Sequence, residues 1–88
     1  MPDLVSIITP MYNSGKFIES TIKSVQDQTY QNWEMIIIND ASTDGSVKIV
    51  ESFAVKDERI KLIKLDSNQG AAAARNRGIK EASGRYIA

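Results

Sequence analysis

Hydrophobic and polar positions follow one another in blocks that predict a regular succession of strands and helices. Nearly continuous apolar runs predict buried strands at residues 4–10, 33–40 and 59–66. Apolar residues spaced three and four apart predict helices around residues 16–25, 47–54 and 71–82. In the first helix this face carries Ile18, Ile22 and Val25, and in the third we expect Ala72, Ile79 and Ala82 to pack. Residues 84–88 predict the opening of a fourth strand.

This alternation predicts an α/β fold, a Rossmann-like three-layer sandwich with three helices over a mostly parallel sheet of about four strands. One domain is expected over residues 1–88. Lys61 and Lys64 interrupt the third strand, and charges of this kind are typical of a sheet edge. An edge position for the third strand favours the order 3-2-1-4, with the first strand in the interior.

The amino-acid composition indicates the class of protein but not its function. The chain has 88 residues, of which 42% are hydrophobic and 25% charged, with 11 basic and 11 acidic side chains. These values are typical of a soluble globular domain. Zero net charge argues against a nucleic acid partner. Cysteine and histidine are absent, so any metal would need oxygen ligands. No apolar run reaches membrane-spanning length, and a cytoplasmic location is the simplest expectation.

The candidate chemistry lies in the loops that follow the strands. In parallel sheets, ligands bind beyond the carboxyl ends of the strands. Three such tips are rich in hydrogen-bonding groups: "TPMYNSG", "NDASTDGS" and "DSNQG". Thr9, Asp40 and Asp66 mark these tips at intervals of 31 and 26 residues, and by that spacing we expect a fourth tip just beyond Ala88.

Common phosphate motifs do not match. A dinucleotide fingerprint needs three glycines after the first strand, where this chain has only Gly15. A P-loop needs Ser or Thr after Gly-Lys, and here Phe17 follows Lys16. A receiver-type site needs an acidic pair after the first strand, and none is present.

An aromatic side chain and a carboxylate remain at neighbouring tips. Tyr12 follows the first strand and Asp40 ends the second, so both can face one cleft across adjacent strands about 4.8 Å apart. A ring that stacks and a carboxylate that accepts an imide N–H suit a pyrimidine base. The alternative is that Asp40 only caps the second helix while Tyr12 covers the core.

Three segments, "VSIITPMYN", "IIINDASTDGS" and "NQGAAAARNRG", together resemble the amino-terminal half of family 2 glycosyltransferases, which have the glycosyltransferase A-type fold. The resemblance implies that Thr9, Pro10 and Tyr12 lie around the nucleotide base. It implies that Asp40 accepts from the uracil imide of a UDP-sugar. In "DGS" we expect a structural role, with a tight turn at Gly45 and a helix cap from the neighbouring Asp or Ser.

The third segment has a physical interpretation beside the resemblance. Residues 71–74 are all alanine, so the helix can pack closely on the sheet, with the partial positive charge of its amino terminus near the cleft. The resemblance implies that Arg75 lies near the nucleotide, whereas the plainer interpretation is a solvated arginine on a helix chosen for its propensity.

The resemblance implies a parent enzyme that inverts configuration as it transfers a sugar from a nucleotide-sugar, with a UDP-sugar favoured, to an acceptor hydroxyl. A sugar, lipid-linked or protein acceptor is left open. The acidic motif that holds Mg²⁺ or Mn²⁺ and the catalytic base are expected beyond Ala88, so we expect no metal ligand, no catalytic residue and no turnover in this chain alone.

Several alternatives stay open at this stage. The fold could serve a non-catalytic nucleotide-binding or assembly domain, and a nucleotidyltransferase is a further alternative to which "TPMYNSGK" is a poor match. A short fourth strand would leave the edge of the first strand unpaired, which predicts a homodimer through that edge. The full-length protein could act at the membrane face.

Overall fold

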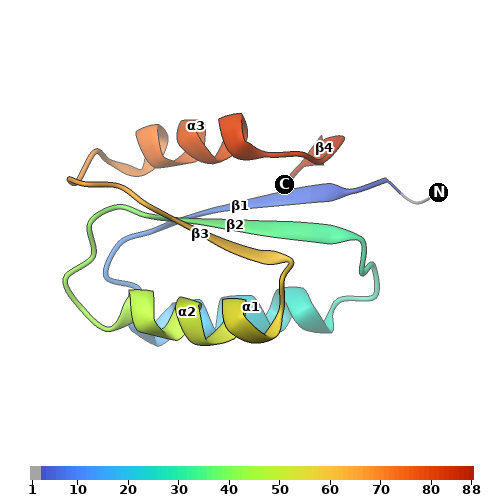
Figure 1. Ribbon diagram of the computed structural model, residues 1–88, viewed down its shortest axis with the longest axis horizontal. Coiled ribbons are helices and arrows are strands. Elements are labelled where there is room, and N and C mark those ends of the chain that lie inside the picture. The colour runs from blue at the N-terminus through green and yellow to red at the C-terminus, as the bar shows by residue number, and fades with distance from the viewer. Residues whose placement is uncertain (1–2) are drawn as a thin grey trace.

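A computed structural model describes residues 3–88, which form four strands and three helices in strict alternation (Figure 1). The elements in chain order are β1 (Val5–Met11), α1 (Gly15–Asp27), β2 (Trp33–Asn39), α2 (Ser46–Lys56), β3 (Ile60–Lys64), α3 (Ala71–Glu81) and β4 (Tyr86–Ile87). Every element that the sequence pattern predicts is therefore present.

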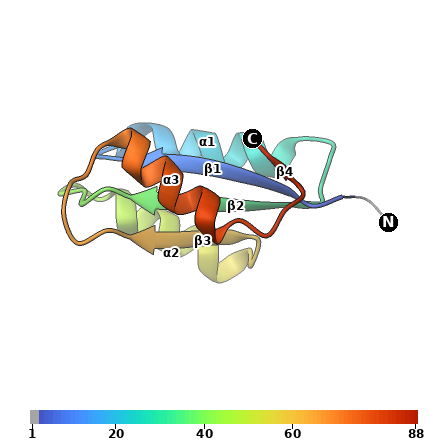
Figure 2. The same cartoon turned by 90° about the horizontal axis from the view of Figure 1, so that it is seen from above.

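The strands form one parallel sheet in the order β3-β2-β1-β4, which confirms the predicted order (Figure 2). β1 and β2 pair along their whole length, from Val5 opposite Trp33 to Met11 opposite Asn39. β4 is much shorter and pairs only with the beginning of β1. β3 is an edge strand, as predicted, and its Lys61 and Lys64 side chains are more than half exposed.

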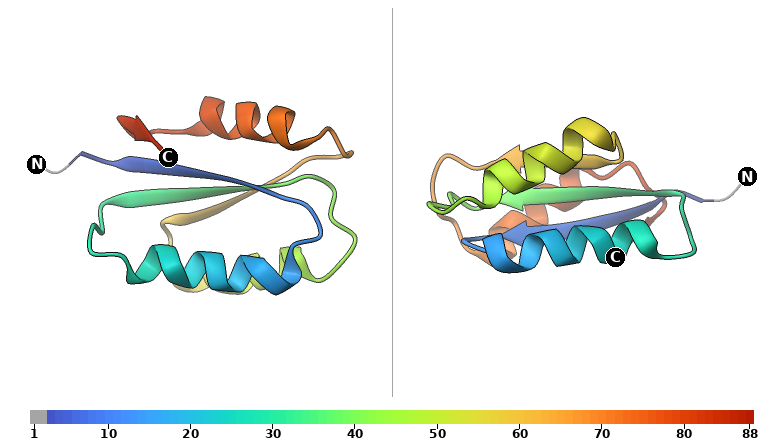
Figure 3. Two further views of the ribbon diagram at one scale, coloured as in Figure 1. Left: turned by 180° about the vertical axis from the view of Figure 1, so that it is seen from behind. Right: turned by 90° about the horizontal axis from the view of Figure 1, so that it is seen from below.

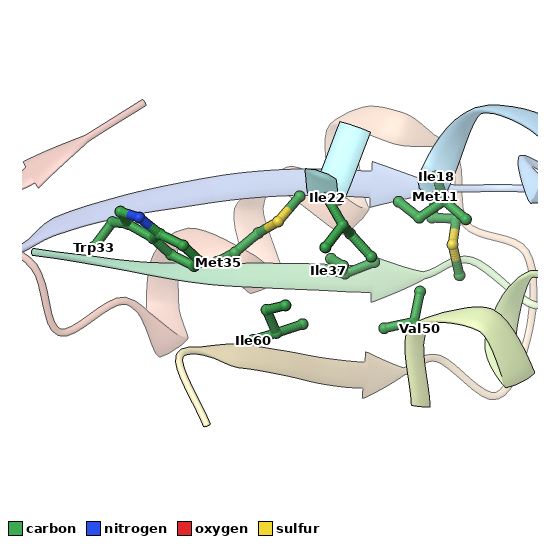
Figure 4. Close-up of a cluster of buried hydrophobic side chains, with 8 residues drawn as sticks. All are labelled: Met11, Ile18, Ile22, Trp33, Met35, Ile37, Val50 and Ile60. Carbon is green, nitrogen blue, oxygen red and sulfur yellow. The ribbon is translucent and has the colours of Figure 1, made fainter. Parts of the chain in front are cut away.

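Helices α1 and α2 lie side by side against one face of the sheet (Figure 3). They enclose the larger core, in which Ile22, Trp33 and Ile37 are essentially inaccessible to solvent. Figure 4 shows this cluster, made of Met11, Ile18, Ile22, Trp33, Met35, Ile37, Val50 and Ile60. Burial of apolar area on this scale is the main stabilising term for a small domain.

Helix α3 alone covers the opposite face (Figure 1). Ala74 is fully buried against Ile36 and Ile38 of β2. A Cβ atom at Gly78 would lie 2.6 Å from both Ile8 and Ile38. The helix therefore approaches the sheet closely through its smallest side chains.

Part of the predicted packing of α3 is wrong. Ile79 is 42% exposed and Ala72 is also exposed, while Ala82 does pack against the smaller core. The predicted face is displaced because Gly78 has no apolar side chain to enter the hydrophobic pattern, although it faces the sheet. None of the helices formed by residues 3–88 is long and apolar enough to cross a membrane.

Candidate functional site

The loops after β1, β2 and β3 gather at one end of the sheet, as parallel strands require (Figure 1). The main chain links the first two directly, because the Asp40 N–H donates to the Met11 carbonyl at 2.8 Å. The third joins them through Leu65, whose N–H donates to the Asn39 carbonyl at 2.9 Å. The three predicted tips therefore form one surface.

Asn13 fastens the β1–α1 loop to the β2–α2 loop. Its side-chain oxygen accepts the backbone N–H groups of Thr43, at 2.8 Å, and of Asp44, at 3.3 Å. Its own N–H donates to the Ser42 hydroxyl at 3.0 Å. Asn13 has a φ of 46°, in the left-handed region that Asn tolerates better than most residues. The sequence interpretation did not single out Asn13; an Asn just before a helix start was the available signal.

The "DGS" segment has the structural role that we expected, but through a different geometry. Asp44 accepts the N–H of Ser46, the first residue of α2, at 3.0 Å and the N–H of Gly15, the first residue of α1, at 3.2 Å. The Ser46 hydroxyl accepts the Ser14 N–H at 3.0 Å. Hydrogen bonds from Ser46 and Gly15 hold the pKa of Asp44 below its usual value.

Gly45 lies in a turn, as predicted, but this turn does not require a glycine. Gly45 has a φ of −80°, which any residue adopts, whereas Ala41 has a φ of 60°. The left-handed turn that reverses the chain after β2 is therefore made by an alanine directly after Asp40. An L-residue in this conformation costs about 1–2 kcal/mol, so the loop holds Ala41 against its own preference.

Asp40 connects the tip of β2 to the start of α3. Its side chain is buried, with 3% of the residue exposed. One carboxylate oxygen accepts the Gln69 N–H at 2.7 Å and the other accepts the Gly70 N–H at 2.9 Å. The Asn68 amide donates to the Asp40 carbonyl at 3.3 Å. Gly70 has a φ of 92° and is the N-cap of α3, so this carboxylate lies at the positive end of that helix.

These contacts correct the plainer alternative that the sequence left open. Asp40 does not cap the second helix; its carboxylate instead orders the loop that begins the third. Tyr12 does not cover the core, because 52% of it is exposed. The role of both residues in binding a nucleotide stays a prediction.

Thr9 and Pro10 lie near the end of β1, opposite Ile37 and Ile38 of β2, and both are half-buried. The part of β1 that pairs with β4 comprises Val5 and Ser6, so Pro10 lies beyond it. Proline cannot donate to a strand ladder and is tolerated where no partner strand runs.

Arg75 lies in the second turn of α3 and is exposed. Within residues 3–88 its side chain forms no hydrogen bond or ion pair, whereas the Arg77 side chain pairs with Glu81 at 3.4 Å. A groove of about 290 Å³ lies along α3, lined by Leu65, Gln69, Ala73, Asn76, Arg77 and Lys80. None of the predicted site residues lines this groove. Since the helix turns 100° per residue, Arg75 points away from the flank that carries Arg77.

The residues that the structure describes contain no group of three or more His, Cys, Asp or Glu side chains placed to hold a metal ion.

Comparison with known proteins identifies relatives that match nearly the whole chain. The sequence profile described as Glycosyl transferase family 2 matches residues 6–88. TuaG of Bacillus subtilis (strain 168), a glycosyltransferase provisionally assigned to teichuronic acid biosynthesis, is 51% identical over 85 residues, which are 97% of this chain and 34% of TuaG. WfgD of Escherichia coli, named as a UDP-Glc:alpha-D-GlcNAc-diphosphoundecaprenol beta-1,3-glucosyltransferase, is 48% identical over 97% of this chain and 33% of its own length.

Solved structures give the same result. A mannosyltransferase from Pyrobaculum calidifontis, PcManGT in complex with GDP-Man and Mn²⁺, superposes with a TM-score of 0.90 at 26% identity, covering 99% of this chain and 26% of PcManGT. TarS of S. aureus in complex with UDP-GlcNAc has a TM-score of 0.84 at 32% identity, and the match covers 94% of this chain and 24% of TarS. The chain spans about a third of the length of the relatives named above and about a quarter of these structures.

Proposed function

Because this chain belongs to glycosyl transferase family 2, we propose that it forms the nucleotide-binding part of an enzyme that transfers a sugar from a nucleotide-sugar to an acceptor hydroxyl. Its sheet order and helices match the glycosyltransferase A-type fold of its structural neighbours. The observation that carries the proposal is the end of the sheet, where the exposed Tyr12 follows β1 beside the buried carboxylate of Asp40.

In this proposal, Tyr12 stacks on the base, with Thr9 and Pro10 beside it. Asp40 contributes in two ways. It holds Gln69 and Gly70 in place, and its lone pairs not used by these two N–H groups accept the imide N–H of a base. Arg75, which has no partner among the described residues, moves to the ribose or the phosphates.

We favour UDP as the nucleotide because a carboxylate at this depth matches the N–H edge of uracil. The neighbours bind different nucleotides, since PcManGT is in complex with GDP-Man and TarS with UDP-GlcNAc. The fold alone therefore does not decide the base, and the preference for UDP rests on Tyr12 and Asp40.

We propose that the residues of the chemical step lie in a longer protein, since this chain spans about a third of the relatives named above. We propose an inverting displacement in which the acceptor hydroxyl attacks the anomeric carbon as the nucleoside diphosphate leaves. Mg²⁺ or Mn²⁺ would stabilise that leaving group, and its ligands and the catalytic base are assigned to positions after Ala88. We propose a role in polysaccharide or glycoconjugate synthesis, because WfgD is named for a diphosphoundecaprenol-linked acceptor. A cytoplasmic location at the membrane face is part of this proposal and has no support from that name.

Self-association through the sheet edge is a separate proposal. β4 pairs with Val5 and Ser6 of β1, and hydrogen bonds beside this pairing reach only from Leu4 to Ile8. The end of β1 is therefore unpaired on that side, and Tyr86 and Ile87 of β4 are about half exposed. Unpaired edges bind further strands, so we propose that two copies of this chain associate there. A constant monomeric mass by light scattering across micromolar concentrations would contradict this.

The nucleotide proposal is tested by calorimetric titration of the chain with UDP, GDP, CDP and ADP, with and without Mn²⁺. Metal-independent binding of UDP alone is the expected result. Tyr12→Ala and Arg75→Ala should each weaken it by about tenfold or more, the cost of one stacking or charge-assisted contact. Arg77→Ala is the matched control, since it changes the same residue type on the other flank of α3.

Asp40→Asn completes the series. It keeps the size of the side chain but removes one acceptor, so UDP binding should be lost and the β3–α3 loop loosened. If a folded chain binds no nucleotide, or if Arg77→Ala weakens binding as much as Arg75→Ala, the assignment of the site is wrong.

A further inference from the structure

A second polar cluster lies at the opposite end of the sheet from the nucleotide-binding loops. Ser6 and Glu34 are the second residues of β1 and β2 and face each other in register. The Ser6 hydroxyl donates to the Glu34 carboxylate at 2.5 Å, and the Ser83 N–H donates to the same oxygen at 2.6 Å. The Gly84 N–H donates to the Ser6 hydroxyl at 2.8 Å. We call Ser6, Glu34, Ser83 and Gly84 the turn cluster.

The two strand residues of the turn cluster are buried, whereas Ser83 is exposed and Gly84 is partly buried. Ser6 is 0% exposed and Glu34 is 3% exposed. A buried carboxylate is costly unless its oxygens are hydrogen-bonded. The second oxygen of Glu34 accepts from Lys61 on β3 at 2.7 Å, with the lysine reaching in from solvent. Burial alone would raise the pKa of Glu34, but the bonds from Lys61, Ser6 and Ser83 lower it to about 2.

Gly84 fits this site because no side chain could. A Cβ atom there would lie 2.4 Å from the Ser6 hydroxyl oxygen, 2.7 Å from the Ser6 nitrogen and 2.8 Å from the Leu4 carbonyl oxygen. Two of these three atoms belong to the backbone and cannot move aside without disturbing β1. The main chain at Gly84 is therefore pressed directly against the start of β1.

β4 begins immediately after this contact. The Arg85 N–H donates to the Leu4 carbonyl at 2.9 Å, and Tyr86 then pairs with Val5. The ladder continues as the Ala88 N–H donates to the Ser6 carbonyl at 2.8 Å and the Ile8 N–H donates to the Ala88 carbonyl at 2.9 Å. So short a strand has little side-chain burial of its own to select this alignment, because both of its residues are exposed.

We propose that Glu34 is a positioning residue which, through the Ser6 hydroxyl and the Ser83–Gly84 turn, sets the register of β4 on β1. Register matters because a shift of one residue turns every side chain of a strand to the opposite face of the sheet. The cluster is the only set of side-chain contacts described between residues 83–84 and the strands.

The functional consequence rests on the proposed function. The strand that continues β4 would deliver its tip beside the tip of β1, where Tyr12 begins the nucleotide-binding surface. In such a longer protein, Glu34 would determine from the far end of the sheet which side chains of that strand face the sugar-nucleotide. It touches neither nucleotide nor acceptor and acts only through the turn.

Lys61 separates this role from simple stabilisation. Its ammonium group binds the Glu34 oxygen that accepts no hydrogen bond from Ser6 or Ser83. Lys61→Met therefore removes an ion pair but leaves all three bonds of the turn cluster. Ser6→Ala removes two of those bonds and keeps the ion pair. Glu34→Leu removes the ion pair and two of the three bonds, leaving the bond from Gly84 to Ser6, and it keeps a side chain of similar size.

Amide hydrogen exchange measured by NMR on the 88-residue chain distinguishes the two roles. In Ser6→Ala and Glu34→Leu, the Ser83, Gly84 and Ala88 amides should exchange about tenfold faster relative to the amides of β2. Inter-strand nuclear Overhauser contacts between Val5 and Tyr86 should weaken or shift by one residue. Lys61→Met should leave both observations as in the unmodified chain.

Uniform acceleration of all strands in the variants, or an equal local effect of Lys61→Met, would overturn the proposal and leave Glu34 as a general stabiliser. If Glu34→Leu does not fold, Ser6→Ala still decides, since it removes a single hydroxyl. The experiment needs no nucleotide, so it can fail while the proposed function stands. Conversely, loss of the nucleotide site would leave the exchange pattern unchanged.

Discussion

Replacing Gly78 with alanine tests whether the close approach of α3 to the sheet is needed. In the native helix this glycine faces the sheet, and an added Cβ would lie 2.6 Å from Ile8 Cγ2 and 2.6 Å from Ile38 Cδ1. The Ile38 methyl ends a flexible chain and can rotate away. The Ile8 methyl branches from the β carbon, so it moves only if χ1 or the strand moves.

Two opposing terms set the magnitude. Alanine is favoured over glycine inside a helix by about 1 kcal/mol. Overpacking of a well-filled core costs about 1–3 kcal/mol, and two contacts this short, one of them with a stiff branch, favour the upper part of that range. We therefore expect Gly78→Ala to lower the free energy of unfolding by about 1–2 kcal/mol.

Urea denaturation measures this change, with the fluorescence of Trp33 as the probe. Trp33 is the sole tryptophan and is 1% exposed, so its emission reports on the larger core. Ala72→Gly provides the control for helix propensity, because Ala72 lies on the exposed side of the same helix. That control should lose up to about 1 kcal/mol without any steric change.

Gly78→Ala should also affect the loop between β3 and α3. If α3 moves outward, Gly70 should draw away from Asp40, and nucleotide binding should weaken in parallel with stability. A Gly78→Ala chain as stable as the unmodified one, or more stable, would refute the conclusion that the helix lies as close to the sheet as the structure shows.

Three further predictions concern stability. Glu34 and Asp57 have pKa values of about 2, below their ordinary 4.5 and 3.8. Their contributions to stability are therefore complete above the ordinary pKa values and are lost as the pH falls toward 2. Urea titrations across this range should show losses of about 3 kcal/mol for Glu34 and about 2 kcal/mol for Asp57, which should be largely absent in Glu34→Gln and Asp57→Asn. Ala41→Gly should raise the free energy of unfolding by up to about 1 kcal/mol, because glycine accepts a φ of 60°, and a lower urea midpoint would contradict the strain. Asn13→Ala should lower the free energy of unfolding by about 1–2 kcal/mol, through lost hydrogen bonds and an unfavourable φ. Asn13→Gly should recover the part due to φ in the same measurement.

The arrangement of the elements could be predicted from the sequence because hydrophobic periodicity is a local property. The continuous run 35–38 in β2 is buried on both faces, as such runs predict, and Lys61 and Lys64 correctly placed β3 at an edge. The packing of α3 was predicted less well. Gly78 lies against the sheet because it has no side chain to hold the helix away, and a glycine does not count as apolar in a hydrophobic pattern.

At the site, residue types could be predicted but their partners could not. The sequence placed Asp40 and Tyr12 at adjacent tips, and the structure confirms that they lie there. It did not predict that Asp40 binds the N–H groups of Gln69 and Gly70, because those contacts span about 30 residues. Similarly, Ala41 takes the left-handed conformation although Gly45 stands nearby, because contacts between loops, not local preference, fix that turn.

The mesh of hydrogen bonds between the first two loops has a consequence for how this protein can evolve. Asn13, Ser42 and Asp44 hold the loops to each other, whereas Tyr12 and Arg75 extend from that scaffold without supporting it. Under the proposed function, substitution of Tyr12 would change the preference for a base with little effect on folding, because this side chain is exposed. The proposed donor preference would then change by single substitutions that each leave the domain folded.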